Sequence, residues 1–415
     1  ASTLAALAES GAWLITARAI QGIGAAFMMP STNALVTNAF PAQERGKALG
    51  IYIALATIFL ALGPLLGGFL TQVFSWRAVF WINFPIALIS IILAISSVPT
   101  WRRREKLNID YLGFFISVIF ISGFVLGFME APNWGWTSLP IMGLFLLSII
   151  SLITFIGWEK KIPHPLVELT LFKNLTFTTL FSVLLIIQAV AIVFVFLAIF
   201  LQNVLHYSPL MAGLLLLPAM VPIMLMAPVG GHLRDKYGPT LPMFCGALLV
   251  VLSLIWIAIF SHNRGYAWLF PGLLVYGIGM PLILSGIMAT VMNMVNAQQR
   301  GMASAIFNCA RQFGNTIGLA LLTGLLASVN KWQLNSFLHH SPVPLSRLKE
   351  QQIDGLLVQS DQAMKAIAHL SLAHIELLKT AALNAYTNAF SMTLLAAAIL
   401  AFLSLFLILK IPRKQ

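Results

Sequence analysis

The chain has 415 residues, of which 59% are hydrophobic and only 9% charged, and its mean hydropathy is +0.92. A soluble domain carries about a quarter charged residues, so this composition excludes that class and indicates an integral membrane protein. The formal charge of +12 does not indicate nucleic-acid binding, because the basic residues stand in short clusters between apolar segments, as in cytoplasmic loops.

Apolar runs of about 20 residues, the length that crosses a bilayer as a helix, follow one another along the chain. We predict eleven spans after an initial stub, ASTLAALA, that resembles the end of another: 11–38, 46–73, 77–97, 111–130, 138–158, 175–203, 209–231, 240–260, 266–293, 299–329 and 388–410. If the spans alternate in direction, most loop lysines and arginines fall on one face, which is therefore cytoplasmic. The predicted fold class is an all-α polytopic membrane protein.

The sequence contains an internal repeat. Residues 22–24 and 277–279 both read GIG, and at the same shift of 255 positions PAQERGKALG (41–50) lies over NAQQRGMASA (296–305). Two helices and a polar loop matching at one constant shift predict two parallel halves, as in many transporters. Three spans precede the repeated pair in the second half, and their counterparts would fall before or barely at residue 1. We therefore expect the N-terminal bundle to lack its first two helices and most of the third.

Four segments carry a family resemblance: RAIQGIGAA (18–26), ALGPLLGG (61–68), SWRAVFWINFP (75–85) and GGHLRDKYGP (230–239). They resemble the motifs of the major facilitator superfamily, in particular its fourteen-helix drug:proton antiporters of the EmrB/QacA type. The resemblance covers essentially the whole chain and implies two pseudo-repeated helix bundles with two extra linking helices. It divides the chain into an incomplete N-terminal bundle (1–100), two linking helices (107–160), five helices of the C-terminal bundle (175–329), an external loop (330–387) and a last helix with a cytoplasmic tail (388–415).

The resemblance implies a proton-coupled transporter that exports drugs or other lipophilic or toxic small molecules across the inner membrane of a bacterium. An importing symporter or facilitator of the same fold is the alternative. A membrane enzyme or scaffold is disfavoured, since the eight histidines are scattered over loops. No GxxxxGK loop occurs, which argues against direct ATP drive. By resemblance, a proton gradient is the expected energy source, and no cofactor or metal is expected. Expected partners are the substrate, protons, the bilayer and a periplasmic adaptor protein. A helical pattern at 361–382 either docks this adaptor or caps the helix bundle.

Two polar faces are predicted within spans. Helical spacing puts Arg18, Gln21 and Gly22 on one side of span 11–38, and a charged residue at such depth normally faces a bundle interior or a water-filled path. By resemblance, Arg18 serves proton coupling by favouring a deprotonated carboxylate nearby. A structural clamp, or a side chain that snorkels to the interface, is the alternative. The second face consists of Asn308, Arg311, Gln312 and Asn315. It is expected to line the transport path, and polar packing between helices is the alternative.

A glycine motif lies at 61–68. Gly63 and Gly67 predict a small face for close helix packing, and Pro64 predicts a bend. Together with Gly68 these residues resemble the antiporter motif, and plain close packing is the alternative. We expect Gly67→Leu to impair transport more than Leu66→Ala does.

The segment GGHLRDKYGP predicts a gating loop made of Gly231, Arg234, Asp235 and Gly238. The span is expected to end here in a short cytoplasmic loop, where Asp235 caps the next helix or pairs with an arginine. By resemblance, Asp235 is the acid of the family's gating motif, and a solvated charge run is the alternative.

None of the twelve acids falls at the middle of a predicted span, so the sequence offers no evident proton-coupling carboxylate. By resemblance that carboxylate belongs to a first helix outside these residues, and Glu130 is the nearest local candidate. We therefore expect the 415 residues to insert in a membrane without proton-coupled efflux, and roughly 80 upstream residues, enough for about three helices, to restore it.

Overall fold

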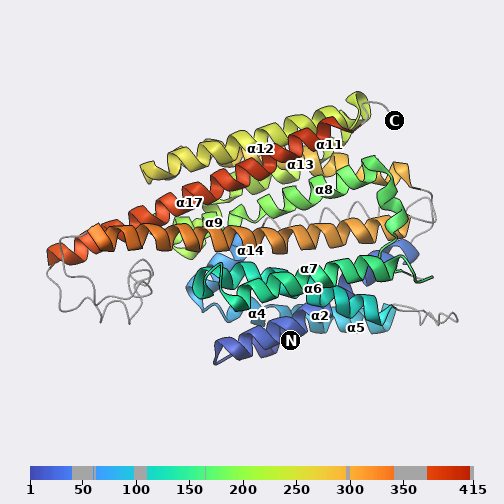
Figure 1. Cartoon of the computed structure of the whole chain (residues 1–415), viewed down its shortest axis with the longest axis horizontal. Helices are drawn as coiled ribbons and strands as arrows, with labels where there is room; N and C mark the ends of the chain where they lie inside the picture. Colours follow the sequence, from blue (N-terminus) through green and yellow to red (C-terminus); the bar gives the residue numbers. More distant parts are fainter. Residues whose placement is uncertain are drawn as a thin grey trace. The chain divides into compact units, whose positions relative to one another are not determined.

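The computed structural model describes residues 1–39, 59, 62–97, 110–163, 165–295, 300–340 and 372–411, and the regular structure in these ranges is helical (Figure 1). The predicted all-α fold class is confirmed. The chain forms two compact units. The first unit comprises Ala1–Leu107 and Tyr207–Met224, and the second comprises Asn108–His206 and Leu225–Gln415.

Nine helices in the described ranges are long and apolar enough to cross a membrane: Ala78–Ser96, Tyr111–Trp134, Leu139–Glu159, Leu175–Asn203, Pro209–Tyr237, Thr240–Asn263, Tyr266–Met294, Met302–Phe337 and His374–Leu409. They correspond to nine of the eleven predicted spans. Of the other two, 11–38 forms the single helix α2 (Gly11–Ala39), and 46–73 is described mainly at its end, as the helix Leu62–Val73. The protein is therefore a multi-pass integral membrane protein.

The helices on both sides extend into the predicted external loop at 330–387. Helix α14 (Arg300–His340) continues beyond the expected end of its span, and α17 (Leu372–Leu409) begins well before residue 388. Neither extension contains glycine or proline, so nothing in the backbone stops the helix. The helical pattern predicted at 361–382 is thus in part the first turns of α17, and its residues 361–371 lie outside the described ranges.

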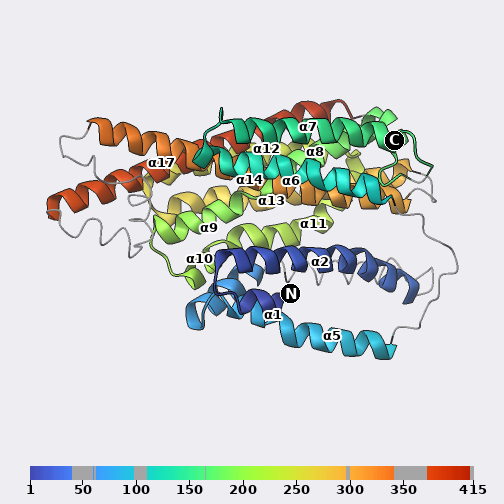
Figure 2. The same cartoon turned by 60° about the horizontal axis from the view of Figure 1, so that its bottom comes forward.

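The first unit is built on the short helix α1 (Ser2–Ala6). It packs against α2, α4 (Ala78–Trp81) and α5 (Asn83–Ser97), which can be followed in Figure 2. The indole of Trp13 donates a hydrogen bond to the carbonyl oxygen of Leu4 at 3.1 Å and so closes the turn between α1 and α2. The unit also contains α10 (Pro209–Leu215) and the first residues of α11 (Leu217–Tyr237).

The second unit begins with the hairpin of α6 (Tyr111–Trp134) and α7 (Leu139–Glu159). It continues through η1 (Leu169–Lys173), α8 (Leu175–Ala191), α9 (Val193–Asn203), the end of α11, α12 (Thr240–Phe260), η2 (Ser261–Asn263), α13 (Tyr266–Met294), α14 and α17. Helix α14 packs against α6, α8 and α17, and α12 packs against α13 and α17. The core is mainly aliphatic and contains aromatic pairs: the ring of Phe200 stacks on Phe390 with centroids 4.4 Å apart, and that of Phe177 meets Phe307 edge to face.

The repeat seen in the sequence is also present in the structure. Shifted by 255 positions, α2 covers α13 from its first residue to its last, and α1 falls on the end of α12 and the start of η2. In both halves the two neighbouring elements pack against each other. In the second half this packing brings backbones together, since a Cβ added at Gly279 would come within 2.7 Å of the carbonyl oxygen of Gly246.

We expect Gly318→Leu to lower the free energy of unfolding of the second unit by about 3 kcal/mol or more, the upper range for overpacking. Any Cβ at Gly318 would overlap the backbone of Ala189 on α8. Gly143→Leu on α7 is the matched control, because a Cβ there meets nothing within 4 Å. Thermal unfolding of the purified variants checks this, and equal midpoints for the two variants would contradict it.

Candidate functional site

A chain of hydrogen bonds joins α1, α2 and α5. Arg18 donates from Nη1 to Oε1 of Gln21 at 2.6 Å, and Gln21 donates from Nε2 to the hydroxyl oxygen of Ser2, also at 2.6 Å. Asn83 donates to the same hydroxyl at 3.3 Å. The polar face predicted for Arg18 and Gln21 therefore exists and is directed at α1. A Cβ on Gly22, the third predicted member, would meet nothing within 4 Å.

Most of the hydrogen-bonding capacity of the Arg18 guanidinium is unused. It carries five N–H donors, while the described contacts are one bond to Gln21 and a position 5.8 Å from the centre of the Phe80 ring. Among the described residues no carboxylate forms an ion pair with it. An exposed arginine positioned by a neutral amide can take a carboxylate or another anion as a further partner. The carboxylate expected near Arg18 stays a prediction.

Arg77, at the start of the predicted span 77–97, also contributes to this cluster. Its Nη2 donates to the carbonyl oxygen of Ala8 at 2.9 Å, and its guanidinium lies 4.4 Å from the centre of the Trp76 ring. Arg77 thereby ties the segment before α4 to the turn between α1 and α2, and so supports the elements that position Arg18. The signal in the sequence was the adjacent pair Trp76 and Arg77 within SWRAVFWINFP.

The glycine motif at 61–68 makes a backbone crossing with α10. A Cβ at Gly68 would overlap the carbonyl oxygen of Pro209, and a Cβ at Gly213 would overlap the carbonyl oxygen of Pro64. The contact is reciprocal: each helix supplies a proline and, one turn later, a glycine. Gln72 extends it by accepting a hydrogen bond from the backbone N–H of Leu210 at 3.2 Å. Helices that meet through backbone rather than through interlocking side chains lie unusually close.

In the part of the chain that the structure describes, the close contact lies one position from the small face predicted from Gly63 and Gly67, so the effect on transport expected for Gly67→Leu is now expected for Gly68→Leu. Among the described residues, a Cβ at either glycine would meet nothing within 4 Å, whereas Gly68 is buried. Pro64 and Gly68 share one side of the helix because they are four residues apart. The sequence alone did not separate the two alternatives, since both pairs have the same spacing.

The predicted polar face of α14 lies on the outside of the second unit. Arg311 and Gln312 are exposed, Asn308 and Asn315 are half-buried, and Nη2 of Arg311 donates to Oδ1 of Asn308 at 3.3 Å. Gly314 and Gly318 of the same helix pack against the backbone of α8, next to this polar face. The four polar side chains share one side of α14, and the lining role assigned to them stays a prediction.

The predicted gating loop is instead the last turn of a helix. Helix α11 continues to Tyr237, so Arg234 and Asp235 are helical and pair with each other, Nη2 to Oδ1, at 2.5 Å. Asp235 does not cap α12, whose N-cap residue Pro239 has no side-chain bond to the helix. Gly238 ends α11 with φ of +79°, and its N–H donates to the carbonyl oxygen of Arg234 at 2.8 Å. Glycine is the residue that most readily adopts this left-handed conformation, so the stop lies at Gly238.

A neighbouring glycine takes the packing role in this segment. A Cβ at Gly231 would meet nothing within 4 Å among the described residues, whereas one at Gly230 would overlap the hydroxyl of Ser285 on α13. Gly230 thus sets how closely the end of α11 approaches α13. From the sequence, Gly231 was the predicted glycine of this motif.

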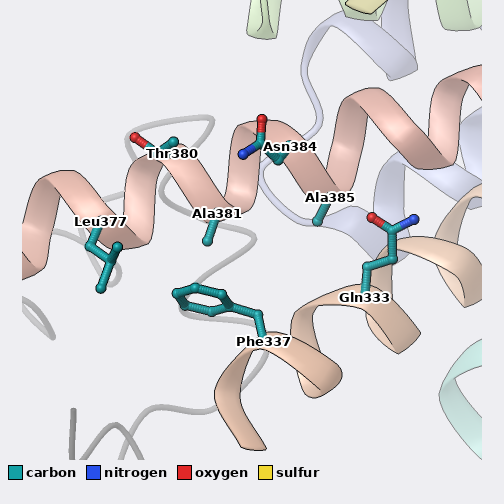
Figure 3. A pocket seen from close by; sticks show the side chains of 7 residues that line it. All are labelled: Gln333, Phe337, Leu377, Thr380, Ala381, Asn384 and Ala385. Atoms are coloured by element: carbon teal, nitrogen blue, oxygen red, sulfur yellow. The ribbon is translucent and has the colours of Figure 1, made fainter. Parts of the chain in front are cut away.

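A cavity of about 230 Å³ lies between α14 and α17 (Figure 3), and it is lined by Gln333, Phe337, Leu377, Thr380, Ala381, Asn384 and Ala385. At its edge Asn384 accepts a hydrogen bond from Arg264, and one turn further Asn388 donates to Gln333 at 3.0 Å. Sites for drug-sized molecules measure about 300–1,000 Å³. The cavity is smaller than that, so it does not by itself form a drug-binding site.

Comparison with known proteins decides the family. The sequence profile of the Major Facilitator Superfamily matches residues 1–319. The chain belongs to the Major Facilitator Superfamily. This places the protein among transporters rather than enzymes. The major facilitator fold is also found in a solved bacterial homolog of the human lysosomal transporter Spinster, in its inward-facing and occupied conformation, with a TM-score of 0.59 and 17% identity over 100% of this chain and 80% of that one.

Several relatives within the superfamily are named for resistance or export. The chain is 33% identical over 344 residues to the multidrug resistance protein Stp of Mycobacterium tuberculosis, with 82% of this chain and 64% of Stp covered. It is 29% identical to the tetracenomycin C resistance and export protein of Streptomyces glaucescens, covering 79% of this chain and 62% of the relative. The multidrug transporter protein MdtP of Bacillus subtilis is 25% identical over 98% of this chain and 78% of MdtP. The chain thus spans less than two thirds of the length of the first two relatives.

Proposed function

We propose that the protein is a proton-coupled efflux antiporter of the fourteen-helix type, which exports drugs or other lipophilic small molecules across the cytoplasmic membrane of a bacterium. The observation that carries the antiport mechanism is the reciprocal backbone crossing of Pro64 and Gly68 with Pro209 and Gly213. Two helices in backbone contact without interlocking side chains can shift against each other, as alternating access requires. The names of the relatives Stp and MdtP support the substrate class.

Arg18 has the electrostatic role in this proposal. Its guanidinium is held by Gln21 and has donors left for a carboxylate. A carboxylate next to an arginine keeps its charge to lower pH, so contact with Arg18 favours proton release, and loss of contact favours proton uptake. A conformational change that moves the carboxylate toward or away from Arg18 would therefore couple proton binding to the transport cycle.

In liposomes with a pH-sensitive dye inside, we expect the purified full-length protein to move a lipophilic fluorescent substrate and protons in opposite directions. An imposed pH gradient should drive the substrate, and an uncoupler should abolish the accumulation. Liposomes with the Gly318→Leu variant, whose second unit is expected to be destabilised, provide the inactive control.

The direction of proton movement separates the alternatives on the same fold. Movement of substrate and protons in the same direction would identify a symporter. Substrate equilibration that ignores both the gradient and the uncoupler would identify a facilitator. Either result would overturn the proposed antiport.

A further inference from the structure

Two carboxyl groups meet at one end of the hairpin formed by α6 and α7. Asp110 is the N-cap residue of α6, and Glu159 is the last residue of α7. The Glu159 side chain is only 3% exposed, and Asp110 is half-buried. In the sequence both residues lie at the ends of predicted spans and, like the other acids of the chain, neither falls at the middle of a span.

Each carboxyl group has one oxygen held by donors and one oxygen left free. Oδ1 of Asp110 accepts from the backbone N–H of Gly113 at 2.9 Å and from the Trp158 indole at 3.0 Å. Oε2 of Glu159 accepts from the backbone N–H of Val167 at 3.2 Å. The remaining oxygens, Oδ2 of Asp110 and Oε1 of Glu159, are buried and have no hydrogen-bond partner among the described residues. Buried polar atoms without partners are rare and indicate a missing proton, water or ion.

The two free oxygens lie against the same glycine. A Cβ added at Gly113 would overlap Oδ2 of Asp110 and would come within 3.0 Å of Oε1 of Glu159. The absence of a side chain at Gly113 therefore leaves the space that both oxygens face. Two carboxylates in such a place cannot both keep a charge, because the charges repel and burial removes the water that would screen them.

We propose that Asp110 and Glu159 form a proton-binding site that holds one proton between Oε1 of Glu159 and Oδ2 of Asp110. Glu159 carries the proton, since donors at 2.9 and 3.0 Å stabilise the negative charge of Asp110, whereas Glu159 has the more distant backbone N–H of Val167, at 3.2 Å, with that of Leu166, and is the more buried. The O–H of Glu159 then donates to Asp110, which gives each free oxygen a partner. A carboxyl pair that shares one proton is stable at a pH at which isolated carboxyl groups are ionised.

Charged groups elsewhere on the surrounding elements do not neutralise the pair. The titratable and charged residues on α6, α7, α14 and the segment up to η1 include Tyr111, Glu130, Lys160, Lys161, Glu168, Lys173, Arg300, Cys309, Arg311, Lys331, His339 and His340. The two lysines that follow Glu159 are exposed and form no ion pair in the described part of the chain. Asp110 is the charged group whose field acts on Glu159.

Infrared difference spectroscopy of the purified protein in lipid bilayers tests this site, because it separates the C=O band of a protonated carboxyl from carboxylate bands. The protein is titrated between about pH 5 and about pH 9, a range above the ordinary pKa values of Asp and Glu. The wild type should show the band of one protonated carboxyl group at neutral pH. Glu159→Gln should remove the band. Asp110→Asn should also remove the band. Asparagine still caps α6, and its amide N–H donates a hydrogen bond to Oε1 of Glu159, so Glu159 can be ionised.

Glu168→Gln is the matched control: it removes a nearby acid, bonded to the Thr170 hydroxyl, and should leave the band unchanged. Absence of the band in the wild type would overturn the proposal. A band that survives Asp110→Asn would overturn it too, since it would belong to an isolated acid. Carboxylate bands that respond to replacement of sodium by choline, with no protonated band, would show a bound cation instead. No transport substrate is needed, so the result does not depend on the proposed efflux function.

Discussion

Gly68→Leu is expected to abolish transport, while Gly67→Leu, one position earlier, is expected to leave it close to the wild-type rate. The leucine at position 68 would occupy the place of the Pro209 carbonyl, so the two helices would have to move apart. Overpacking of this kind costs about 1–3 kcal/mol or more, and every 1.4 kcal/mol corresponds to a factor of ten. We therefore expect a loss of substrate efflux of roughly fivefold to 100-fold or more, measured in energised cells at matched expression levels.

The reciprocal geometry gives this prediction a further control. Gly213→Leu should have the same effect as Gly68→Leu, because its side chain would displace the Pro64 carbonyl. Once either leucine has separated the helices, the second costs less, so the double variant should be less impaired than the sum of the two single variants implies. Equal efflux by Gly67→Leu and Gly68→Leu would show that this crossing is not used in transport.

In the full-length protein, Arg18→Ala is expected to stop efflux without preventing membrane insertion. Removing a charge from an apolar span eases insertion, whereas the lost interaction with a carboxylate, a charged hydrogen bond, is worth about 1.5–3 kcal/mol. Efflux should therefore fall by roughly 10- to 100-fold. Uncoupler-sensitive dye efflux and the thermal midpoint of the purified variant are the two measurements.

The two measurements separate an electrostatic from a structural role for Arg18. Gln21→Ala removes the bond that positions the guanidinium but keeps the charge, so it should reduce efflux less than Arg18→Ala does. If Arg18→Ala lowers the thermal midpoint as strongly as Gly318→Leu and in step with its loss of efflux, Arg18 is a structural clamp. Efflux near the wild-type rate would exclude a coupling role.

The sequence by itself determined the class of protein, the position of most spans and the internal repeat. Hydrocarbon forces every backbone polar group to be satisfied within a helix, so a long apolar run has one stable structure in the membrane. At a shift of 255 positions, α2 matches α13 over its full length. The same shift relates the two GIG segments, so the sequence already showed this repeat. The polar face of Arg18 and Gln21 was equally predictable, because helical spacing alone defines it.

Only the tertiary structure decided which side of each helix makes contact. In a span that is apolar on every side, hydropathy does not mark the inner face, and contact depends on where two backbones can approach. That is why Gly68 rather than Gly67 lies at the crossing with α10. It is also why Asp110 and Glu159, 49 positions apart in the sequence, could be recognised as a pair only once α6 and α7 were seen side by side.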